Sequence, residues 1–355
     1  MRVLQVDSGR EWRGGQNQVR LLTRELARAP WEAGVEQRLV TKRDSELARR
    51  AAADQVAVSG VPWTIGLDPR AFWRVFLAIL DFHPDLVHAH DSHALFFALA
   101  ARRFADRSAD VPAPCVVATR RVDFHLRRWS PWLRADHLIA VSQAVKAVLV
   151  ADGADSADIT VVPDGIDPDE VRDGAARALA IRAKLGLPAG APLAVNVAAL
   201  VDHKDQRTLI RAAHVARALN PELHWAIAGE GGRREALERE IRTLGLSDRV
   251  HLLGYVPEAD ALIREADVFV MSSKEEGLGS VVLHALALGR PVVATRGGGL
   301  PEILPERCLV DVGDADALAQ AVVRALQHPS PVPLPPQCTA AAMAESVLAV
   351  YRSLV

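Results

Sequence analysis

Short hydrophobic runs alternate with amphipathic stretches along the first half of the chain. The runs are rich in Val, Ile and Leu and predict β-strands, whereas the stretches between them carry apolar residues at helical spacing, as in Val19, Leu22 and Leu26. The predicted strands cover residues 3–7, 37–41, 55–58, 86–89, 116–119, 137–141 and 159–162. Strands that alternate with helices in this way are typical of a parallel sheet covered by helices on both faces.

The same pattern begins again in the second half, where the predicted strands cover residues 193–197, 224–228, 250–253, 268–271 and 292–294. The segment 163–168, PDGIDP, separates the halves because its prolines and turn-forming residues interrupt both periodicities. We therefore expect an N-terminal domain over residues 1–165, a C-terminal domain over 166–335, and a final helix within 336–355 that packs back on the N-terminal domain. The expected fold class is α/β, with two doubly wound Rossmann-like domains that face each other across a cleft.

Composition and charge narrow the choice of partners and compartment. The chain has 355 residues with 42 Lys and Arg against 44 Asp and Glu, a net charge of −2, so nucleic acid is not an expected partner. The three cysteines, Cys115, Cys308 and Cys338, are far apart and predict neither a disulfide framework nor a zinc site. The sequence begins with a predicted strand and contains no apolar run of membrane-spanning length, so a cytoplasmic protein is expected.

Glycines and one lysine follow the predicted strands, where ligands bind in open parallel sheets. Gly14 and Gly15 open the first predicted helix, whose free amides could bind an anion, although a glycine turn that only reverses the chain explains the pattern equally well. In the second half Gly229 and Gly231 join a strand to a helix in the same way. Lys204 precedes another helix and could pair with a diphosphate, or it could be an ordinary surface lysine.

The stretch from Val268 to Gly299 carries the most specific motif. A strand is followed by Ser-Ser-Lys-Glu-Glu276-Gly-Leu-Gly279, an apolar helix, a second strand and Arg296-Gly-Gly-Gly-Leu-Pro-Glu302. This order resembles the donor site of retaining GT-B glycosyltransferases of the family-four group. The resemblance extends over nearly all of the C-terminal domain. It continues more loosely into the N-terminal half, through Gly14, Gly15 and the segment that ends at His90.

The resemblance implies a role for each matching residue, with a nucleotide diphosphate sugar as the donor substrate and no separate cofactor. Glu276 would hydrogen-bond hydroxyls of the transferred sugar, Lys204 would neutralise the departing diphosphate, and His90 would contact the donor sugar. Amides would bind the phosphates at Gly15 and along Gly277, Leu278 and Gly279. Preorganised amides and a lysine can stabilise a diphosphate without Mg²⁺, and no Asp-x-Asp pair ends a predicted strand, so no metal is expected.

Two positions depart from the family pattern. His284 stands where the family commonly has a glutamate that binds the ribose diol, and Ala199 stands where it has an arginine near the lysine. An imidazole cannot accept from both hydroxyls as a carboxylate does, so His284 either binds the ribose differently or is a helix residue without a ligand. Arg120 and Arg121, which follow a predicted strand, are candidates to replace the missing cation; the alternative is a basic turn paired with Asp123.

A further segment, residues 125–134, mixes cations with Trp129 and Trp132. Such a mixture suits the headgroup zone of a membrane, and peripheral contact with the inner membrane face is one interpretation, while ordinary packing of the tryptophans is the other. His88 and His93 flank His90 and could assist acceptor binding.

The leading hypothesis is transfer of a sugar to a hydroxyl of a saccharide or glycolipid acceptor. The resemblance implies retention of anomeric configuration and a setting in envelope polysaccharide or glycolipid synthesis. Two alternatives stay open: a non-hydrolysing nucleotide-sugar epimerase on the same scaffold, and a catalytically weakened subunit that binds a sugar nucleotide without turnover. His284 and Ala199 motivate the second alternative.

Overall fold

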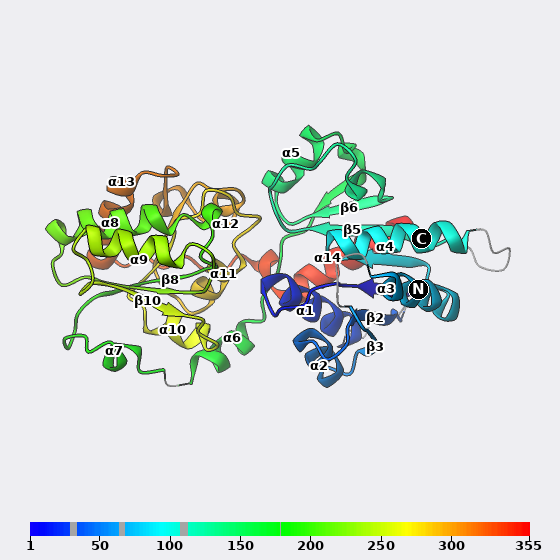
Figure 1. Ribbon diagram of the computed structural model, residues 1–355, viewed down its shortest axis with the longest axis horizontal. Coiled ribbons are helices and arrows are strands. Elements are labelled where there is room, and N and C mark those ends of the chain that lie inside the picture. The colour runs from blue at the N-terminus through cyan, green and yellow to red at the C-terminus, as the bar shows by residue number, and fades with distance from the viewer. Residues whose placement is uncertain (29–33, 64–67, 107–112, 178) are drawn as a thin grey trace. The chain divides into compact units, whose positions relative to one another are not determined.

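The computed structural model describes residues 1–28, 34–63, 68–106, 113–177 and 179–355. The chain divides into two compact units. One consists of Met1–Gly165 together with Gln337–Val355, and the other of Ile166–Pro336. Each unit is a parallel sheet with helices packed on it (Figure 1).

The N-terminal unit contains a seven-stranded parallel sheet in the order β3-β2-β1-β4-β5-β6-β7. Because β1 lies between β2 and β4, the strand order changes direction there, and the loops after β1 and β4 open at the same edge of the sheet. Its strands are β1 (Arg2–Val6), β2 (Glu36–Lys42), β3 (Ala57–Val61), β4 (Leu86–Ala89), β5 (Cys115–Arg120), β6 (His137–Ala140) and β7 (Ile159–Val161). Its first helices are α1 (Gly14–Arg28), α2 (Glu46–Ala53), α3 (Pro69–Phe82), α4 (Ser92–Ala105) and α5 (Gln143–Ala151).

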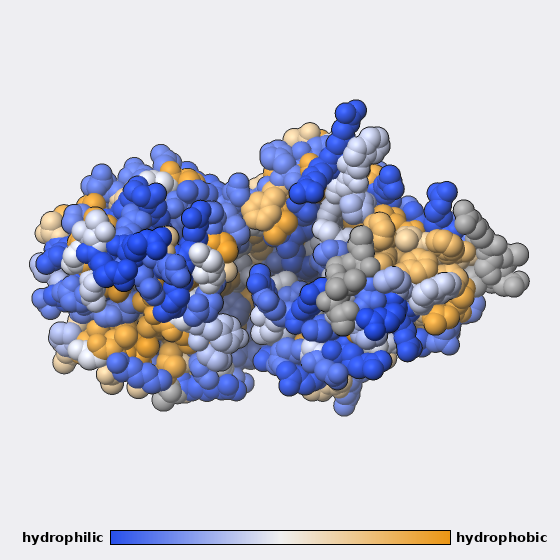
Figure 2. All heavy atoms as spheres, viewed as in Figure 1, coloured by the Kyte–Doolittle hydropathy of each residue, from blue (hydrophilic) through white to orange (hydrophobic). Residues whose placement is uncertain are grey.

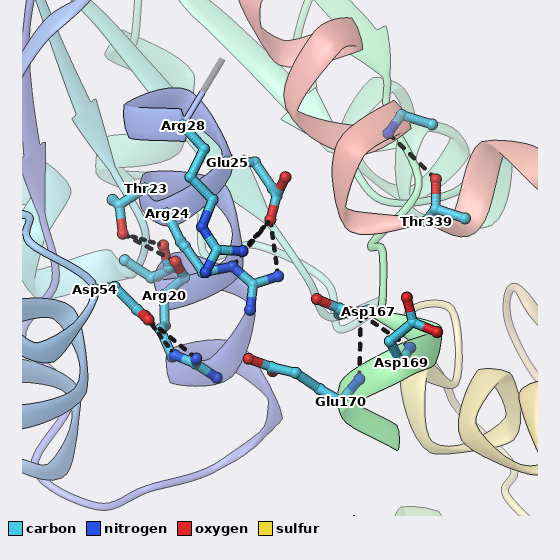
Figure 3. Close-up of polar contacts among 12 residues, drawn as sticks. Arg20, Thr23, Arg24, Glu25, Arg28, Asp54, Asp167, Asp169, Glu170 and Thr339 are labelled. Carbon is cyan, nitrogen blue, oxygen red and sulfur yellow. Dashed lines mark hydrogen bonds and ion pairs between the residues drawn. The ribbon is translucent and has the colours of Figure 1, made fainter. Parts of the chain in front are cut away.

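The last helix, α14 (Ala340–Leu354), belongs to this N-terminal unit although it follows the other unit in the sequence. Met343, Val347 and Leu348 are buried in one apolar cluster with Leu22 of α1. The Thr339 hydroxyl caps the helix by accepting from the Ala342 amide at 3.3 Å (Figure 3). The chain end is therefore a structural part of the first sheet's covering layer.

Arg20 and Arg24 of α1 form ion pairs, and the partner of Arg20 lies at the end of α2. Arg20 makes an ion pair at 2.6 Å with Asp54, which caps the end of α2, and both side chains are mostly buried (Figure 3). Arg24 is 1% exposed and pairs with Glu25 at 2.7 Å. A buried arginine is tolerated here because a carboxylate neutralises it.

The C-terminal unit contains a six-stranded parallel sheet in the order β10-β9-β8-β11-β12-β13. Its strands are β8 (Leu193–Val197), β9 (His224–Ala228), β10 (Val250–Gly254), β11 (Val268–Met271), β12 (Val292–Thr295) and β13 (Leu309–Val310). Its helices are α6 (Pro168–Ala175), α7 (Ile181–Lys184), α8 (Gln206–Leu219), α9 (Arg234–Thr243), α10 (Ala259–Glu265), α11 (Ser280–Ala287), α12 (Leu300–Ile303) and α13 (Ala315–Gln327). The Asp167 carboxylate caps α6 by accepting from the amides of Asp169 and Glu170 (Figure 3).

All but one of the strand predictions are confirmed to within one residue, and one observed strand was not predicted. The strand predicted at 55–58 lies at Ala57–Val61, because Gln55 has a positive φ of 64° in the turn that ends α2. The two-residue strand β13 was not predicted, since so short a run carries no periodicity. The three cysteines are free thiols. No helix within the described ranges is long and apolar enough to cross a membrane.

Candidate active site

Lys204 and Glu276 form an ion pair at the strand ends of the C-terminal unit. Lys204 ends a short 3-10 turn after β8, and Glu276 lies in the loop between β11 and α11. The Ser273 hydroxyl donates to the same carboxylate at 3.2 Å, while the Ser272 hydroxyl donates to the Lys204 carbonyl at 3.0 Å. Two residues that are 72 positions apart in the sequence are thus held together by side chains of one loop.

The loop after Glu276 presents backbone amides at the beginning of α11. Gly279 caps this helix with a φ of 90°, a conformation that favours glycine. Within the described chain, the amides of Gly277, Leu278 and Gly279 have no hydrogen-bond partner. Leu278 as a whole residue is 3% exposed. Amides at a helix N-terminus beside a lysine make a site suited to an anion.

Gly229 and Gly231 have a packing role of their own. A Cβ atom on Gly229 would lie 1.9 Å from the Ala198 carbonyl oxygen, and one on Gly231 would lie 2.3 Å from the Leu200 carbonyl oxygen. These glycines let the loop after β9 lie directly against the loop after β8, where the Leu200 amide donates to the Glu230 carbonyl at 2.9 Å. Glycine is therefore required here by the protein itself, and binding of a ligand by these two residues stays a prediction.

His284 is not an isolated helix residue. Its Nδ1 lies 2.6 Å from a carboxylate oxygen of Asp260 on the neighbouring helix α10. The carboxylate favours a proton on Nδ1, which leaves Nε2 as the nitrogen open to another partner. Ala199, the other departure from the family pattern, lies in the β8 loop and accepts from the Gln206 side chain at 2.9 Å through its carbonyl.

His90 follows β4 in the N-terminal unit and ends a chain of buried hydrogen bonds. Its Nε2 donates to Gln5 Oε1 at 2.8 Å, and Gln5 Nε2 donates to the Tyr351 hydroxyl at 3.2 Å. The Tyr351 hydroxyl donates to His88 Nδ1, and His88 Nε2 donates to Thr119 Oγ1 at 2.7 Å. This assignment gives every bond one donor and one acceptor. The C-terminal helix α14 is thereby linked to His90.

The hydrogen-bond chain leaves one atom of His90 unused. Its Nδ1 is buried and has no hydrogen-bond partner among the described residues. Burial, with smaller contributions from His88 and Arg121, holds the pKa of His90 well below its usual value, so the ring is neutral and Nδ1 carries a lone pair. A buried, neutral acceptor without a partner is suited to a hydroxyl or an amide of a ligand.

His88 differs from what the sequence suggested. It is fully buried beneath His90, with the ring centroids 4.1 Å apart, and both of its nitrogens are satisfied by the protein. His88 therefore has no ring nitrogen left for direct contact with an acceptor, and an indirect role in acceptor binding stays a prediction. His93, by contrast, is exposed and lines a cavity of about 370 Å³ at the ends of β1 and β4. The cavity is lined by Ser8, Gly9, Arg10, Trp63, Asp91, Ser92 and His93.

Asp7 follows β1 at the same sheet edge and was not singled out in the sequence. It is 1% exposed and accepts from the Gly9 amide at 2.8 Å. Burial, and then the neighbouring Asp91 carboxylate, raises the pKa of Asp7 to about 7. A carboxyl group poised near neutrality is a frequent feature of functional sites. Its position directly after the first strand was the only sequence signal.

Arg120 and Arg121 are both held by the N-terminal unit. Arg120 ends β5, donates to the Phe124 carbonyl at 2.6 Å and lies over the Trp132 ring, while burial lowers its pKa. Arg121 makes an ion pair at 3.1 Å with Asp164. Arg120 Nε and Arg121 Nη1 are buried and have no partner in the part of the chain that the structure describes, so each arginine has a donor left for a ligand. That either arginine compensates the negative charge of a phosphate stays a prediction.

Gly14 and Gly15 begin α1, as predicted. A Cβ atom on Gly15 would meet nothing within 4 Å, and this residue has no positive φ. The fold therefore does not require glycine at position 15, which contrasts with Gly229. Close approach of a ligand to the backbone is a remaining reason for glycine there.

The two tryptophans of residues 125–134 behave differently. Trp132 is buried and donates to the Ser92 hydroxyl at 3.1 Å, whereas Trp129 is 80% exposed. The packing interpretation thus holds for Trp132. Across the described ranges no group of three or more His, Cys, Asp or Glu residues is arranged to hold a metal ion.

Comparison with known proteins gives matches over both halves of the chain. The family described as "Glycosyl transferases group 1" matches residues 178–343, and "Glycosyltransferase Family 4" matches residues 12–170. The lipopolysaccharide core biosynthesis glycosyltransferase LpsE of Rhizobium meliloti is 38% identical over 153 residues, which are 42% of this chain and 44% of the relative. A GDP-mannose-dependent alpha-(1-6)-phosphatidylinositol monomannoside mannosyltransferase of Mycolicibacterium smegmatis is 34% identical over 207 residues, 55% of this chain and 54% of the relative. The chain thus spans about half the length of these two relatives.

The solved structures agree with the fold. Anabaena Alr3699/HepE, in a complex with UDP-glucose, superposes with a TM-score of 0.75 at 20% identity, over 100% of this chain and 98% of the other. The prediction of two Rossmann-like domains of the GT-B type is confirmed by this likeness and by the two parallel sheets. The chain belongs to the family-four group of GT-B glycosyltransferases.

Proposed function

We propose that this protein transfers a sugar from a nucleotide diphosphate sugar to a hydroxyl of a saccharide or glycolipid acceptor, with retention of anomeric configuration. The observation that carries the proposal is the Lys204–Glu276 ion pair beside the free amides of Gly277, Leu278 and Gly279. This arrangement joins a cation, a helix N-terminus and a carboxylate at one strand end. It suits a ligand with an anionic part and a hydroxyl-rich part.

In the proposed reaction the bond between the sugar C1 and the diphosphate oxygen breaks, and a bond from C1 to the acceptor oxygen forms on the same face. The acceptor proton passes to the departing phosphate oxygen. Lys204 and the amides stabilise the negative charge that the leaving group accumulates, because they are already oriented toward it. Glu276 accepts hydrogen bonds from hydroxyls of the transferred sugar and positions it.

The N-terminal unit contributes both neutral and positively charged groups in this proposal. The lone pair of His90 Nδ1 accepts a hydrogen bond from a sugar hydroxyl, and the Gly15 amide donates to the distal phosphate. Arg120 or Arg121 adds positive charge, in place of the family arginine that Ala199 replaces.

In the C-terminal unit, Asp260 keeps the proton of His284 on Nδ1, and His284 offers its Nε2 to the nucleotide ribose.

The names of similar proteins support the choice of donor and acceptor. The Anabaena structures contain UDP or UDP-glucose, and the two relatives act by name in lipopolysaccharide core synthesis and on a phosphatidylinositol mannoside. From these similar proteins we infer that this chain also uses a nucleotide-sugar donor and that it acts in envelope polysaccharide or glycolipid synthesis. We also propose that no divalent metal is needed, since Lys204 and the amides supply the positive charge; EDTA should leave the rate unchanged.

The test is slow hydrolysis of nucleotide sugars by the purified protein, which needs no acceptor. Release of free sugar from one member of a donor panel supports a transferase, and Glu276→Gln should abolish the release. Binding of a donor without release by the wild type would support the weakened subunit instead. Inversion of a sugar stereocentre in the recovered nucleotide sugar, detected by NMR, would support the epimerase. Either of these two results would overturn the proposal.

A further inference from the structure

An exposed aromatic surface lies on α3 and α4 of the N-terminal unit, and the proposed sugar transfer does not use it. Trp73 and Leu77 of α3 are 55% and 51% exposed, and Phe96 and Phe104 of α4 are 45% and 50% exposed. Figure 2 shows hydrophobic residues gathered over these two helices. We call this surface the aromatic patch; it consists of Phe72, Trp73, Phe76, Leu77, Phe96 and Phe104.

The patch is continuous across the two helices. The Phe72 ring lies 5.5 Å from Trp73 and 5.4 Å from Phe104, so it joins α3 to α4. Phe96 and Phe104 are eight positions apart and therefore lie on one face of α4. Scattered exposed apolar residues are ordinary, but a contiguous aromatic surface indicates a binding partner.

The charges around the patch are mainly positive. Arg74 and Arg103 are exposed beside it, and neither has a partner within the described ranges. The exposed carboxylates on these two helices, Asp81 and the capping residue Asp106, lie at the helix ends, and Asp81 is paired with Arg38. Two exposed arginines without a carboxylate partner among the described residues are best complemented by an anionic partner.

We infer that the aromatic patch binds the surface of a lipid bilayer that contains anionic lipids. Trp and Phe side chains partition into the interfacial zone of a membrane, and nearby arginines are attracted to anionic headgroups. The patch combines both on two adjacent helices. This inference assigns peripheral membrane contact to a surface different from residues 125–134, in which Trp129 is the single large hydrophobic residue that is exposed.

The position of the patch also suggests why such contact would be useful. Ser92 and His93, at the beginning of α4, line the cavity at the strand ends, and the same helix carries Phe96 and Phe104. Attachment through α4 would therefore keep the cavity close to lipid headgroups. That the cavity then receives a lipid-linked acceptor rests on the proposed function, whereas binding of the bilayer does not.

The test is co-sedimentation of the full chain with vesicles of phosphatidylcholine alone and of phosphatidylcholine with phosphatidylglycerol. We expect binding to the anionic vesicles, a roughly tenfold loss for Trp73→Ser with Phe96→Ser, and a loss of several-fold for Arg74→Ser with Arg103→Ser. Trp129→Ser is the matched control, since it removes a more exposed tryptophan beside arginines, and it should bind as the wild type does. Thermal unfolding would verify that each variant is folded.

Three results would overturn the inference. They are the absence of vesicle binding by the wild type, loss of binding in Trp129→Ser but not in the patch variant, and a concentration-dependent dimer that the patch variant abolishes. Donor hydrolysis, measured without vesicles, should be unchanged in the patch variant. A failure of the membrane inference is thereby distinguished from a failure of the proposed sugar transfer.

Discussion

The two sheets of this protein have the same architecture but opposite chemistry at their strand ends. In the N-terminal unit His90 is buried, neutral and fixed by an uncharged hydrogen-bond chain through Gln5 and Tyr351. In the C-terminal unit Lys204 and Glu276 are charged and partly exposed. Burial disfavours charge, so the first site suits hydroxyl groups and the second an anion. The two strand ends are therefore suited to different kinds of ligand group.

Of the two sites, the charged one should lose more activity when a single side chain is removed. Lys204→Ala removes the cation that we assign to the leaving group, and we expect donor hydrolysis to fall by about 10³-fold. The two side chains are only 17% and 13% exposed, so the variant also leaves Glu276 without its cation and should lose stability, and thermal unfolding would verify that it is folded. Lys184→Ala, an exposed lysine of the same unit, is the matched control. Equal rates for the two variants would show that Lys204 does not act on the leaving group.

Replacing a glycine should have different effects in the two units: at Gly229 it should lower stability, and at Gly15 it should lower activity. Gly229→Ala should lower the free energy of unfolding by about 3 kcal/mol, because the new Cβ would collide with the Ala198 carbonyl at a φ of 144°. Gly15→Ala meets no atom, so it should unfold as the wild type does but hydrolyse the donor more slowly. Urea unfolding and a rate assay on both variants test this. Full activity in Gly15→Ala would show that no ligand approaches the backbone closely enough to require glycine at this position.

Asp7 should make the N-terminal unit sensitive to pH. Its pKa rises from 3.8 to about 7 on folding, so the folded state binds the proton more tightly and stability is lost as the pH rises through this range. The wild type should lose on the order of 3 kcal/mol more than Asp7→Asn between pH 4 and pH 8. Unfolding midpoints of both proteins at these pH values give the difference. Parallel profiles would mean that Asp7 is ionised in the folded protein.

Tyr351 should act as a positioning residue for His90. Tyr351→Phe removes the hydroxyl that accepts from Gln5 and donates to His88, and we expect a loss of about 2 kcal/mol in stability. Because His90 loses part of its support, kcat should fall several-fold while the KM for the donor stays constant. Tyr255→Phe, at an exposed tyrosine of the other unit, is the control. A stability loss without any change in kcat would limit Tyr351 to a structural role.

The smallest effect is expected at Asp260. Asp260→Asn removes the charge that favours a proton on His284 Nδ1, and the affinity for a nucleotide should weaken by only a few-fold, since the hydrogen bond can re-form. Titration calorimetry with UDP, GDP and ADP would detect it. If His284→Ala also binds these nucleotides as tightly as the wild type, His284 does not contact the ribose.

Much of this protein could be predicted because local patterns carry the information. Alternating strands and helices determined two parallel α/β units, and the order of motifs from Val268 to Gly299 placed Glu276 and its glycines in a loop before a helix. Gly279 is the clearest case, since its φ of 90° is a local requirement for glycine. The break at residues 163–168 likewise follows from proline and turn chemistry alone.

Only the tertiary structure decided which distant residues meet. Tyr351 contacts His88 across 263 positions, Arg121 pairs with Asp164, and Asp260 reaches His284 from another helix. Hydrophobic periodicity indicates which face of an element is buried but not which element covers it, so none of these pairs was visible in the sequence. The strand order that brings the ends of β1 and β4 together depends in the same way on contacts between distant segments.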